Sequence, residues 1–560
     1  ASGNTTPGSK VSGKRAVPNP PALPARPAAP SDQALTESMV APSGSMDAVS
    51  TPLASARMAP SGDTGRPAPA SGDRFAPIDR SGFMRVSDQP VSTFSMDVDT
   101  GSYAYARRLI TRQGRLPQAE AVRAEEMINY FDYGYPAPAS EEDAFSVNVD
   151  LLSAPWSSQN RIMRVGVQGF DVPLDERPRA NLVFLVDVSG SMQSPDKIGL
   201  LKRSMRLLLD QLGPEDTVAL VSYASGPSRL LEPTPASRPG KILDALDALK
   251  AGGSTAGAAG LKTAYRLAEE NFDPDAINRI FLATDGDFNV GQTDEMALEE
   301  YVDAKRDTGI YLSVLGFGTG NYNDHMMQAL AQNGNGVAAY VSSLSEARKV
   351  LVDELTANLV TIAEDAKIQV EFNPSEVRAY RLIGYETRTL AEEDFNNDAV
   401  DAGDIGSGHS VTALYEIVPA HAAMPESGDG GSIDPYRYPG NRADPAISGT
   451  GTDTMVGELA FLKFRHKAPG ADVSSLKTQA VPAALDDFPA SGLSRRESRF
   501  ALAVAAFAEK LSGSRHLEGY GYDEILAEAR ASLGPDPRGF RNEFLRLVQD
   551  AASLEKMERE

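Results

Sequence analysis

The chain has 560 residues, of which 41% are hydrophobic and 23% are charged, a composition typical of soluble globular proteins rather than disordered or fibrous ones. It is long enough for two or three separately cored domains, because single cores stop growing near roughly 250 to 300 residues. The formal net charge of −23 would repel nucleic-acid phosphates and anionic lipid surfaces. Cysteine is absent, which excludes disulfides, thiolate metal sites and a cysteine nucleophile. No stretch reaches the roughly 18 to 20 apolar residues needed to span a bilayer.

Residues 1–90 are dominated by Ala, Pro, Ser and Gly and contain only two aromatic residues, Phe75 and Phe83. Such a segment cannot bury enough apolar surface to offset its ordering entropy, so we predict a disordered tether. A plain linker is favoured over a Pro-rich recognition motif. The chain starts at Ala1 without an initiator Met or an apolar signal, which leaves a removed export signal open. From this tether and this start we expect an exported protein, periplasmic or at a membrane or cell surface, with a cytoplasmic location as the alternative.

Residues 91–180 alternate in a way that predicts an α+β segment ahead of the central domain. Its expected strands are 91–98, 145–152 and 161–168, and its expected helices are 103–111 and 119–131.

Residues 181–361 repeat the order of apolar strand, turn and amphipathic helix. Continuous apolar runs at 182–186, 218–224, 279–283 and 311–317 are typical of strands buried on both faces of a parallel sheet. Between the first two runs, apolar residues recur at helical spacing from Ile198 to Leu212. These patterns predict an α/β fold with a doubly wound, mainly parallel sheet.

Residues 362–490 return to strand patterns, interrupted by a Gly, Pro and Asp-rich stretch at 424–454 that we interpret as a long loop. Residues 491–560 carry helical stripes, one of them on Phe500, Val504 and Phe507. Each flank of the central domain has too few strands to close a core alone. We therefore hypothesise that the two flanks form one sandwich.

Oxygen-bearing side chains follow the predicted parallel strands where those strands end. Asp187, Ser189 and Ser191 lie in DVSGSM after the first strand, Thr255 lies in GGSTAG, and Asp285 follows the strand ending in LAT. Loops at the carboxyl ends of parallel strands share one edge of the sheet, where ligands bind. Oxygen ligands in octahedral geometry suit Mg²⁺, so we predict a Mg²⁺ site at these five residues, with Mn²⁺ or Ca²⁺ as alternatives.

The charge of this predicted site indicates what it accepts. Asp187 would be the only directly bound carboxylate, with neutral Ser189, Ser191 and Thr255, and Asp285 would act mainly through water. The metal would keep positive charge and an exchangeable position. An Asp or Glu side chain of another protein could complete the coordination in a charge-assisted contact.

The three loops DVSGSM, GGSTAG and LATDGD resemble the metal-ion-dependent adhesion site of von Willebrand factor type A domains. That resemblance implies binding of Mg²⁺ or Mn²⁺ and a role in protein adhesion or complex assembly. FSMDVDTGSYAYARRLI, AVRAEEMINYFDYGYP, GFGTGNYND and IQVEFNPSEVRAYRLIGYE, with DFNNDAVDAGDIGSGHSVTALYEIVP, are similar to segments of the bacterial YfbK-like family. This second resemblance implies an N-terminal extension, a type A domain and a C-terminal domain of unknown function.

Other polar residues have plainer interpretations. Ser189 and Ser191 could also cap a helix, and Thr255 and Asp285 could serve as turn residues. Asp287 and Asn289 are weaker candidates for a role beside the metal. Asp97 and Asp99, and the series Asp394, Asn396, Asp398, Asp401 and Asp404, resemble calcium loops, but neither has the bidentate Glu of an EF-hand. We expect solvated turns for both, and a structural or solvated role for His325.

Three functions are compatible with these sequence features. The leading one is a binding or scaffolding protein, not an enzyme, that docks a partner's acidic side chain on Mg²⁺. An accessory subunit of an AAA-type ATPase complex is the alternative. A Mg²⁺-dependent hydrolase is disfavoured because the chain has no GxSxG elbow, P-loop or HExxH motif.

Overall fold

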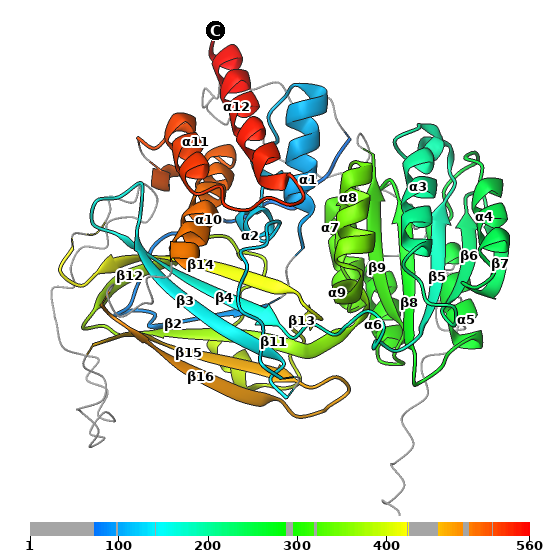
Figure 1. The fold of residues 1–560 in the computed structure, drawn as a ribbon, viewed down its shortest axis with the longest axis horizontal. Coiled ribbons are helices and arrows are strands. Elements are labelled where there is room, and N and C mark those ends of the chain that lie inside the picture. Colours follow the sequence, from blue (N-terminus) through cyan, green and yellow to red (C-terminus); the bar gives the residue numbers. More distant parts are fainter. Residues whose placement is uncertain are drawn as a thin grey trace, which may run out of the picture. The chain divides into compact units, whose positions relative to one another are not determined.

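A computed structural model describes residues 72–96, 99–140, 142–286, 295–318, 322–422, 424, 457–484, 492–517 and 519–560. These residues form a six-stranded mainly parallel sheet, two antiparallel sheets and a layer of helices (Figure 1). Among them, no helix is both long and apolar enough to cross a membrane. The predicted loop at 424–454 lies outside the described residues apart from Met424.

The parallel sheet confirms the predicted α/β fold class. Its strands follow the order β10-β9-β8-β5-β6-β7, and all neighbours are parallel except β6 and β7. The strands are β5 (Ala180–Asp187), β6 (Thr217–Tyr223), β7 (Pro227–Pro235), β8 (Ile277–Thr284), β9 (Tyr311–Phe317) and β10 (Ala338–Val341).

Helices cover both faces of this sheet because successive side chains of a strand point to opposite faces. Val183 and Leu185 of β5 pack with one set of helices, and Leu182 and Phe184 pack with the other. The first set is α5 (Gly257–Glu270), α6 (Glu295–Arg306) and α7 (Asp324–Asn333). The second set is α3 (Ile198–Leu209), α4 (Pro239–Ala248), α8 (Leu344–Arg348) and α9 (Leu355–Leu359).

The two antiparallel sheets combine strands from before and after the parallel sheet. One has the order β1-β12-β14-β4-β3, and the other has the order β13-β11-β15-β16 with β2 also paired to β11. Residues of both sheets share one apolar core, as expected for the hypothesised sandwich. The strands are β1 (Met84–Arg85), β2 (Val91–Ser95), β3 (Phe145–Ser153), β4 (Arg161–Gly169), β11 (Thr361–Phe372), β12 (Val377–Leu382), β13 (Gly403–Gly406), β14 (Ser410–Pro419), β15 (Glu458–Lys467) and β16 (Ser475–Pro482).

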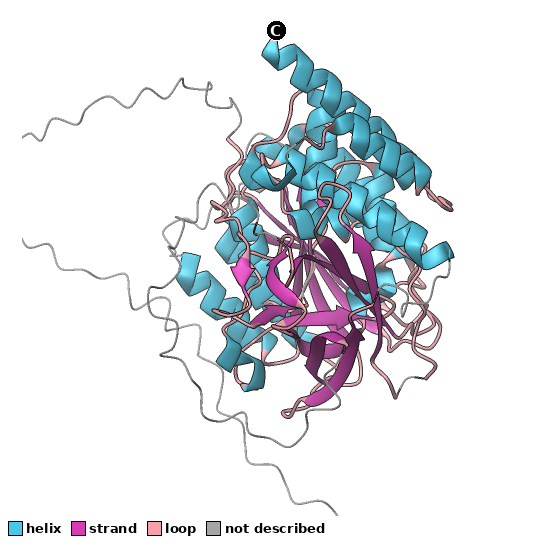
Figure 2. Cartoon of the chain, turned by 90° about the vertical axis from the view of Figure 1, so that its left-hand side faces the viewer, coloured by secondary structure: helices cyan, strands magenta, loops and turns pink. Residues whose placement is uncertain are grey.

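A helical layer packs against the sheet that contains β4 and β14. Ile162 of β4 and Leu414 of β14 belong to the same core as the helices, and Figure 2 shows the long helices lying across the strands. The layer comprises α1 (Gly101–Arg108), α2 (Ala124–Ile128), α10 (Gly492–Leu511), α11 (Tyr522–Ala531) and α12 (Phe540–Arg559). The helix predicted at 103–111 lies within the helical segment that begins with α1, whereas the helix predicted at 119–131 is shorter than expected. A π-helical turn (Leu109–Gln113) follows α1, and a 3₁₀ turn (Ala119–Ala121) precedes α2.

Residues 72–90 differ from the prediction, because they make specific contacts with the fold although we assigned them to the tether. The carboxylate of Asp73 accepts hydrogen bonds from the Tyr105 hydroxyl and the backbone N–H of Tyr322, both at 2.9 Å. Arg80 donates to the carbonyls of Ala119 and Val122. A few such specific contacts offset the ordering entropy, and composition alone does not reveal them. The rest of the predicted tether, residues 1–71, lies outside the described residues.

Candidate metal centre in the type A domain

Asp187 is the last residue of β5, and its side chain is fully buried. Its Oδ1 accepts a hydrogen bond from the backbone N–H of Ser189 at 2.7 Å. Its Oδ2 accepts from the hydroxyls of Tyr223, at 3.2 Å, and Thr284, at 3.3 Å. These donors come from the carboxyl ends of β6 and β8, the strands on either side of β5. The carboxylate is therefore held in one orientation at the centre of the sheet edge.

Ser189 and Ser191 follow directly, and their Oγ atoms lie 2.9 Å apart. Ser189 is buried, whereas Ser191 is exposed. Ser189 precedes a 3₁₀ turn (Gly190–Gln193), but its side chain makes no capping hydrogen bond there. Helix capping, the alternative interpretation of these serines, therefore does not describe Ser189 in this structure.

The loop that carries Thr255 is joined to the loop after β5 by backbone hydrogen bonds. The N–H of Gly252 donates to the carbonyl of Val188 at 2.7 Å, and the N–H of Gly190 donates to the carbonyl of Gly253 at 3.1 Å. Gly253 has φ +96°, and a Cβ atom there would lie 2.8 Å from the Ser225 Oγ, so glycine suits this position. The structure thus brings the half-buried Thr255 to the same sheet edge as Asp187.

Asp285 follows β8 directly and is fully buried. Its Oδ2 lies 2.9 Å from the Nζ of Lys197, a residue just before α3 whose side chain is 10% exposed. Asp285 is close enough to Asp187 to contribute to the raised pKa of Asp187. Asp287 and Asn289 lie outside the described residues.

The surroundings of the Asp187 carboxylate suit a divalent cation. Burial is the largest cause of its raised pKa of about 6, with the charge of Asp285 adding to it. Among the described residues, the groups that hydrogen-bond Asp187 are neutral donors, and no lysine or arginine forms an ion pair with it. A buried carboxylate without a cation is costly. The donor set, two carboxylates and three hydroxyls, fits a hard cation such as Mg²⁺.

Three residues of this centre were not identified from sequence. Tyr223 and Thr284 hold Asp187, and Lys197 pairs with Asp285. Thr284 directly precedes Asp285, and Tyr223 ends its strand at the same edge. Tyr223 and Thr284 could therefore have been predicted, because each is a polar residue at the carboxyl end of a strand beside β5. Lys197 lies ten residues beyond Asp187, in a loop without regular spacing, and the sequence offered no signal for its contact.

The remaining sequence candidates have other surroundings. Asp99 is buried and accepts hydrogen bonds from the Ala338 N–H and from Arg388, both at 3.0 Å. The prediction of a solvated turn is therefore wrong for Asp99, while Asp97 lies outside the described residues. His325 is exposed in the first turn of α7, where either a structural or a solvated role had been expected.

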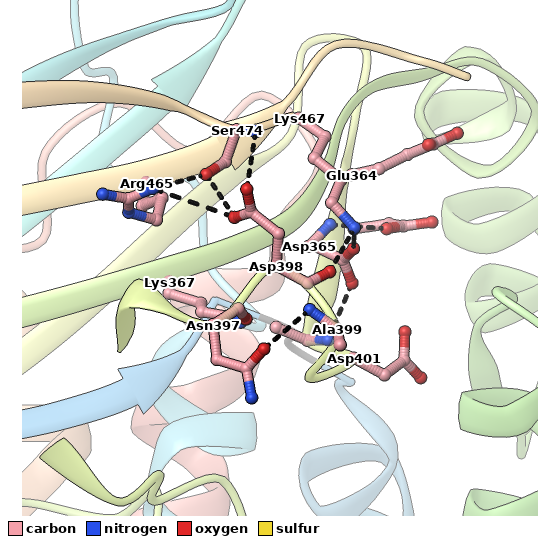
Figure 3. A network of polar contacts seen from close by, with 12 residues as sticks. Glu364, Asp365, Lys367, Asn397, Asp398, Ala399, Asp401, Arg465, Lys467 and Ser474 are labelled. Carbon is pink, nitrogen blue, oxygen red and sulfur yellow. Dashed lines mark hydrogen bonds and ion pairs between the residues drawn. The ribbon is translucent and has the colours of Figure 1, made fainter. Parts of the chain in front are cut away.

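Part of the acidic series near residue 400 lies in a network of polar contacts around Asp398 (Figure 3). The carboxylate of Asp398 accepts hydrogen bonds from the hydroxyl and the N–H of Ser474. Asp401 pairs with Arg306 of α6 at 2.8 Å, and the nearby Asp365 pairs with Lys467 at 2.6 Å. Burial raises the pKa of Asp404 well above its usual range. The solvated-turn prediction is wrong for Asp404, whose Oδ2 is buried. Asp398 is half-buried against Ser474. Asp401 is exposed, as a solvated turn predicts, although it pairs with Arg306. Asn396 is exposed, and Asp394 is half-buried.

The fold and the strand-edge loops define a protein built on a von Willebrand factor type A domain, and residues 182–287 match the family model described as the von Willebrand factor type A domain. Residues 357–554 match the model of the C-terminal region of the uncharacterized protein YfbK. Residues 69–164 match a further model described as von Willebrand factor. In this structure that last range supplies helices and sandwich strands.

The chain is 42% identical over 484 residues to the protein of Escherichia coli K12 described as the uncharacterized protein YfbK. The match spans 85% of this chain and 80% of that protein. The chain therefore belongs to the YfbK family.

Solved structures with the same type of domain are more distant. A von Willebrand factor type A protein from Catenulispora acidiphila is 13% identical, with 72% of this chain and 88% of that chain covered and a TM-score of 0.38. The ArnB paralog VWA2 from Sulfolobus acidocaldarius is 14% identical, with 74% and 98% covered and a TM-score of 0.33.

Proposed function

We propose that this protein binds Mg²⁺ at the carboxyl edge of its parallel sheet and there docks an acidic side chain of another protein. The proposed metal-binding residues are Asp187, Ser189, Ser191, Thr255 and Asp285. The observation that carries the proposal is the fully buried Asp187 carboxylate, whose described partners are all neutral. A divalent cation would compensate that charge.

Each residue would have a distinct task in such a site. Asp187 would supply the anionic ligand, with Tyr223 and Thr284 fixing its orientation through their hydroxyls. Ser189 and Ser191 would place two neutral oxygens on one side of the ion. When bound, Mg²⁺ would supply a position that accepts an outside oxygen ligand. Because Ser191 is exposed, an incoming side chain could reach that side of the site.

Binding rather than hydrolysis is supported by the surroundings of Ser189. Its hydroxyl contacts Ser191, and within the described part of the chain no histidine hydrogen-bonds it. A serine nucleophile is commonly activated by an adjacent base within hydrogen-bond reach.

An affinity-capture experiment tests the docking proposal. Full-length protein is incubated with a native extract in Mg²⁺ or in chelator, using wild type, Asp187→Ala and the control Asp244→Ala. Asp244 is exposed on α4. We expect partners that wild type and Asp244→Ala retain only in Mg²⁺ and that Asp187→Ala loses. Partners retained equally in chelator would contradict the proposal.

An exported location is a further proposal, supported by the Ala, Pro and Ser-rich composition of residues 1–90. Fractionation of native cells tests it, and a purely cytoplasmic pool would contradict it.

A further inference from the structure

Lys197 is a buried cation beside the candidate metal centre, and no sequence signal pointed to it. We propose that Lys197 is a specificity-determining residue of this centre. Its fixed positive charge neutralises Asp285, so that a bound divalent cation retains a net positive charge for the carboxylate of a partner. The inference rests on the proposed function and concerns how the same site selects its ligand.

The position of Lys197 in the fold favours a role at the site over a role in helix stability. Lys197 directly precedes α3. The N-terminal end of a helix carries a partial positive charge, so a cation is unfavourable there. Its side chain is nevertheless largely buried, with Nζ 2.9 Å from the Oδ2 of the fully buried Asp285. The ion pair with Asp285 offsets the unfavourable dipole and the lost hydration.

The loop after β9 is shaped around the lysine side chain. Gly318 has φ +81°, and a Cβ atom at that position would overlap the side-chain carbons of Lys197. The carbonyl of Gly318 accepts a hydrogen bond from the hydroxyl of the buried Tyr340. The side chain of Lys197 is therefore packed against the loop at Gly318. This packing holds the ammonium group in place at the site.

Lys197 sets the net charge of the metal-loaded site. Asp187 and Asp285 together would cancel the charge of Mg²⁺, since the three hydroxyl ligands are neutral. The ammonium of Lys197 returns one positive charge to the site, and one incoming carboxylate would then make the whole neutral. The neighbouring Asp196 adds no further net charge, because it is paired with Arg108 of α1. Without Lys197, the centre should hold Mg²⁺ more tightly and attract a carboxylate less.

The test compares metal and carboxylate affinities in the full-length protein. Isothermal titration calorimetry measures the Kd for Mg²⁺. Acetate is then titrated into the Mn²⁺-loaded protein, and the relaxation of water protons reports displacement of metal-bound water. We expect Lys197→Met to bind Mg²⁺ about tenfold more tightly and acetate about tenfold more weakly than wild type, given the size of a unit charge effect at a few ångströms in a partly buried site.

Control variants separate charge from shape. Lys197→Arg keeps the charge, and Lys241→Met removes a charge from an exposed position on α4; both should retain wild-type affinities. Lys197→Gln is a second neutral variant, and near-UV circular dichroism checks the fold of each. Unchanged or weaker Mg²⁺ binding in the neutral variants would overturn the inference, as would Lys197→Arg behaving like Lys197→Met.

Failure of the inference is distinguishable from failure of the proposed function. If wild type binds no Mg²⁺, both are wrong. If wild type binds Mg²⁺, Asp187→Ala does not, and Lys197→Met matches wild type, then only the role of Lys197 is wrong.

Discussion

The hydroxyl of Tyr223 holds the Asp187 carboxylate from the neighbouring strand. Burial and the negative charge of Asp187 keep the pKa of Tyr223 well above its usual range, so this group stays a neutral donor. Tyr223→Phe should lower the free energy of unfolding by about 1.5 to 3 kcal/mol, as expected for a lost hydrogen bond to a charged group. Tyr265→Phe is the matched control, since its buried hydroxyl has no hydrogen-bond partner among the described residues. Urea unfolding measures both, and equal effects would contradict this role of Tyr223.

Glu125 on α2 links stability to pH. Burial, assisted by the charge of Glu386, raises its pKa from 4.5 to about 7. The folded protein therefore keeps this proton between pH 4.5 and 7, whereas the unfolded chain releases it, and Glu125 makes stability fall as pH rises through that range. Glu125→Gln should remove this loss, raising stability at pH 8 relative to pH 4.5 by on the order of 3 kcal/mol compared with wild type. Urea unfolding across pH checks this, and Glu120→Gln, at an exposed position, should leave the pH profile unchanged.

The sequence predicts some residues of the candidate metal centre but not the side chains that contact them, and the reason is physical. Asp187, Ser189, Ser191 and Asp285 could be placed at one edge because they directly follow apolar strands or continue their turns. The partners that tune them come from other strands and loops, as Lys197 does. Which side chains meet across such distances depends on packing, which local patterns do not encode.

At the scale of elements, α2 and α7 are joined by a buried ionic cluster. Arg123, just before α2, makes a bidentate contact with Asp324 of α7 at 2.7 and 3.0 Å and also pairs with Glu126. Arg123→Met would leave two buried carboxylates without this cation, so the free energy of unfolding should fall by about 3 to 5 kcal/mol. Arg206→Met breaks an exposed pair with Asp247 and should cost less than about 1 kcal/mol. Thermal and urea unfolding compare the two, and similar losses would argue against the cluster's importance.

Strands with a strong apolar pattern were predictable, whereas the edge strands β7 and β16 were not. β5, β8 and β9 are continuous apolar runs because helices cover both faces of their sheet. β7 begins and ends with proline and carries polar residues, which is compatible only with an edge strand. β16, at the edge of its sheet, exposes Leu476, Thr478 and Ala480 at alternate positions and buries only Val481. A strand with one partner and a solvated face lacks the hydrophobic signal on which such predictions depend.

At the scale of the whole molecule, the sandwich depends on both flanks of the type A domain. β4 lies between β3 and β14, and its register with β14 runs from Arg161 to Gln168. A protease site inserted beside the exposed Leu174 would cut the chain after β4. We expect the two fragments to co-elute in size-exclusion chromatography under native conditions and to separate in urea. Fragments that separate natively and remain folded would show that the flanks are independent domains.

The proposed function depends on binding of Mg²⁺ at the type A domain, which calorimetric titration of Mg²⁺ into the purified protein measures. Wild type should bind one Mg²⁺ per chain at the strand edge. Asp187→Ala should bind none while staying folded, because it also removes a buried, uncompensated charge. Absence of binding in wild type, or equal binding in Asp187→Ala, would show that the strand edge is not a Mg²⁺ site.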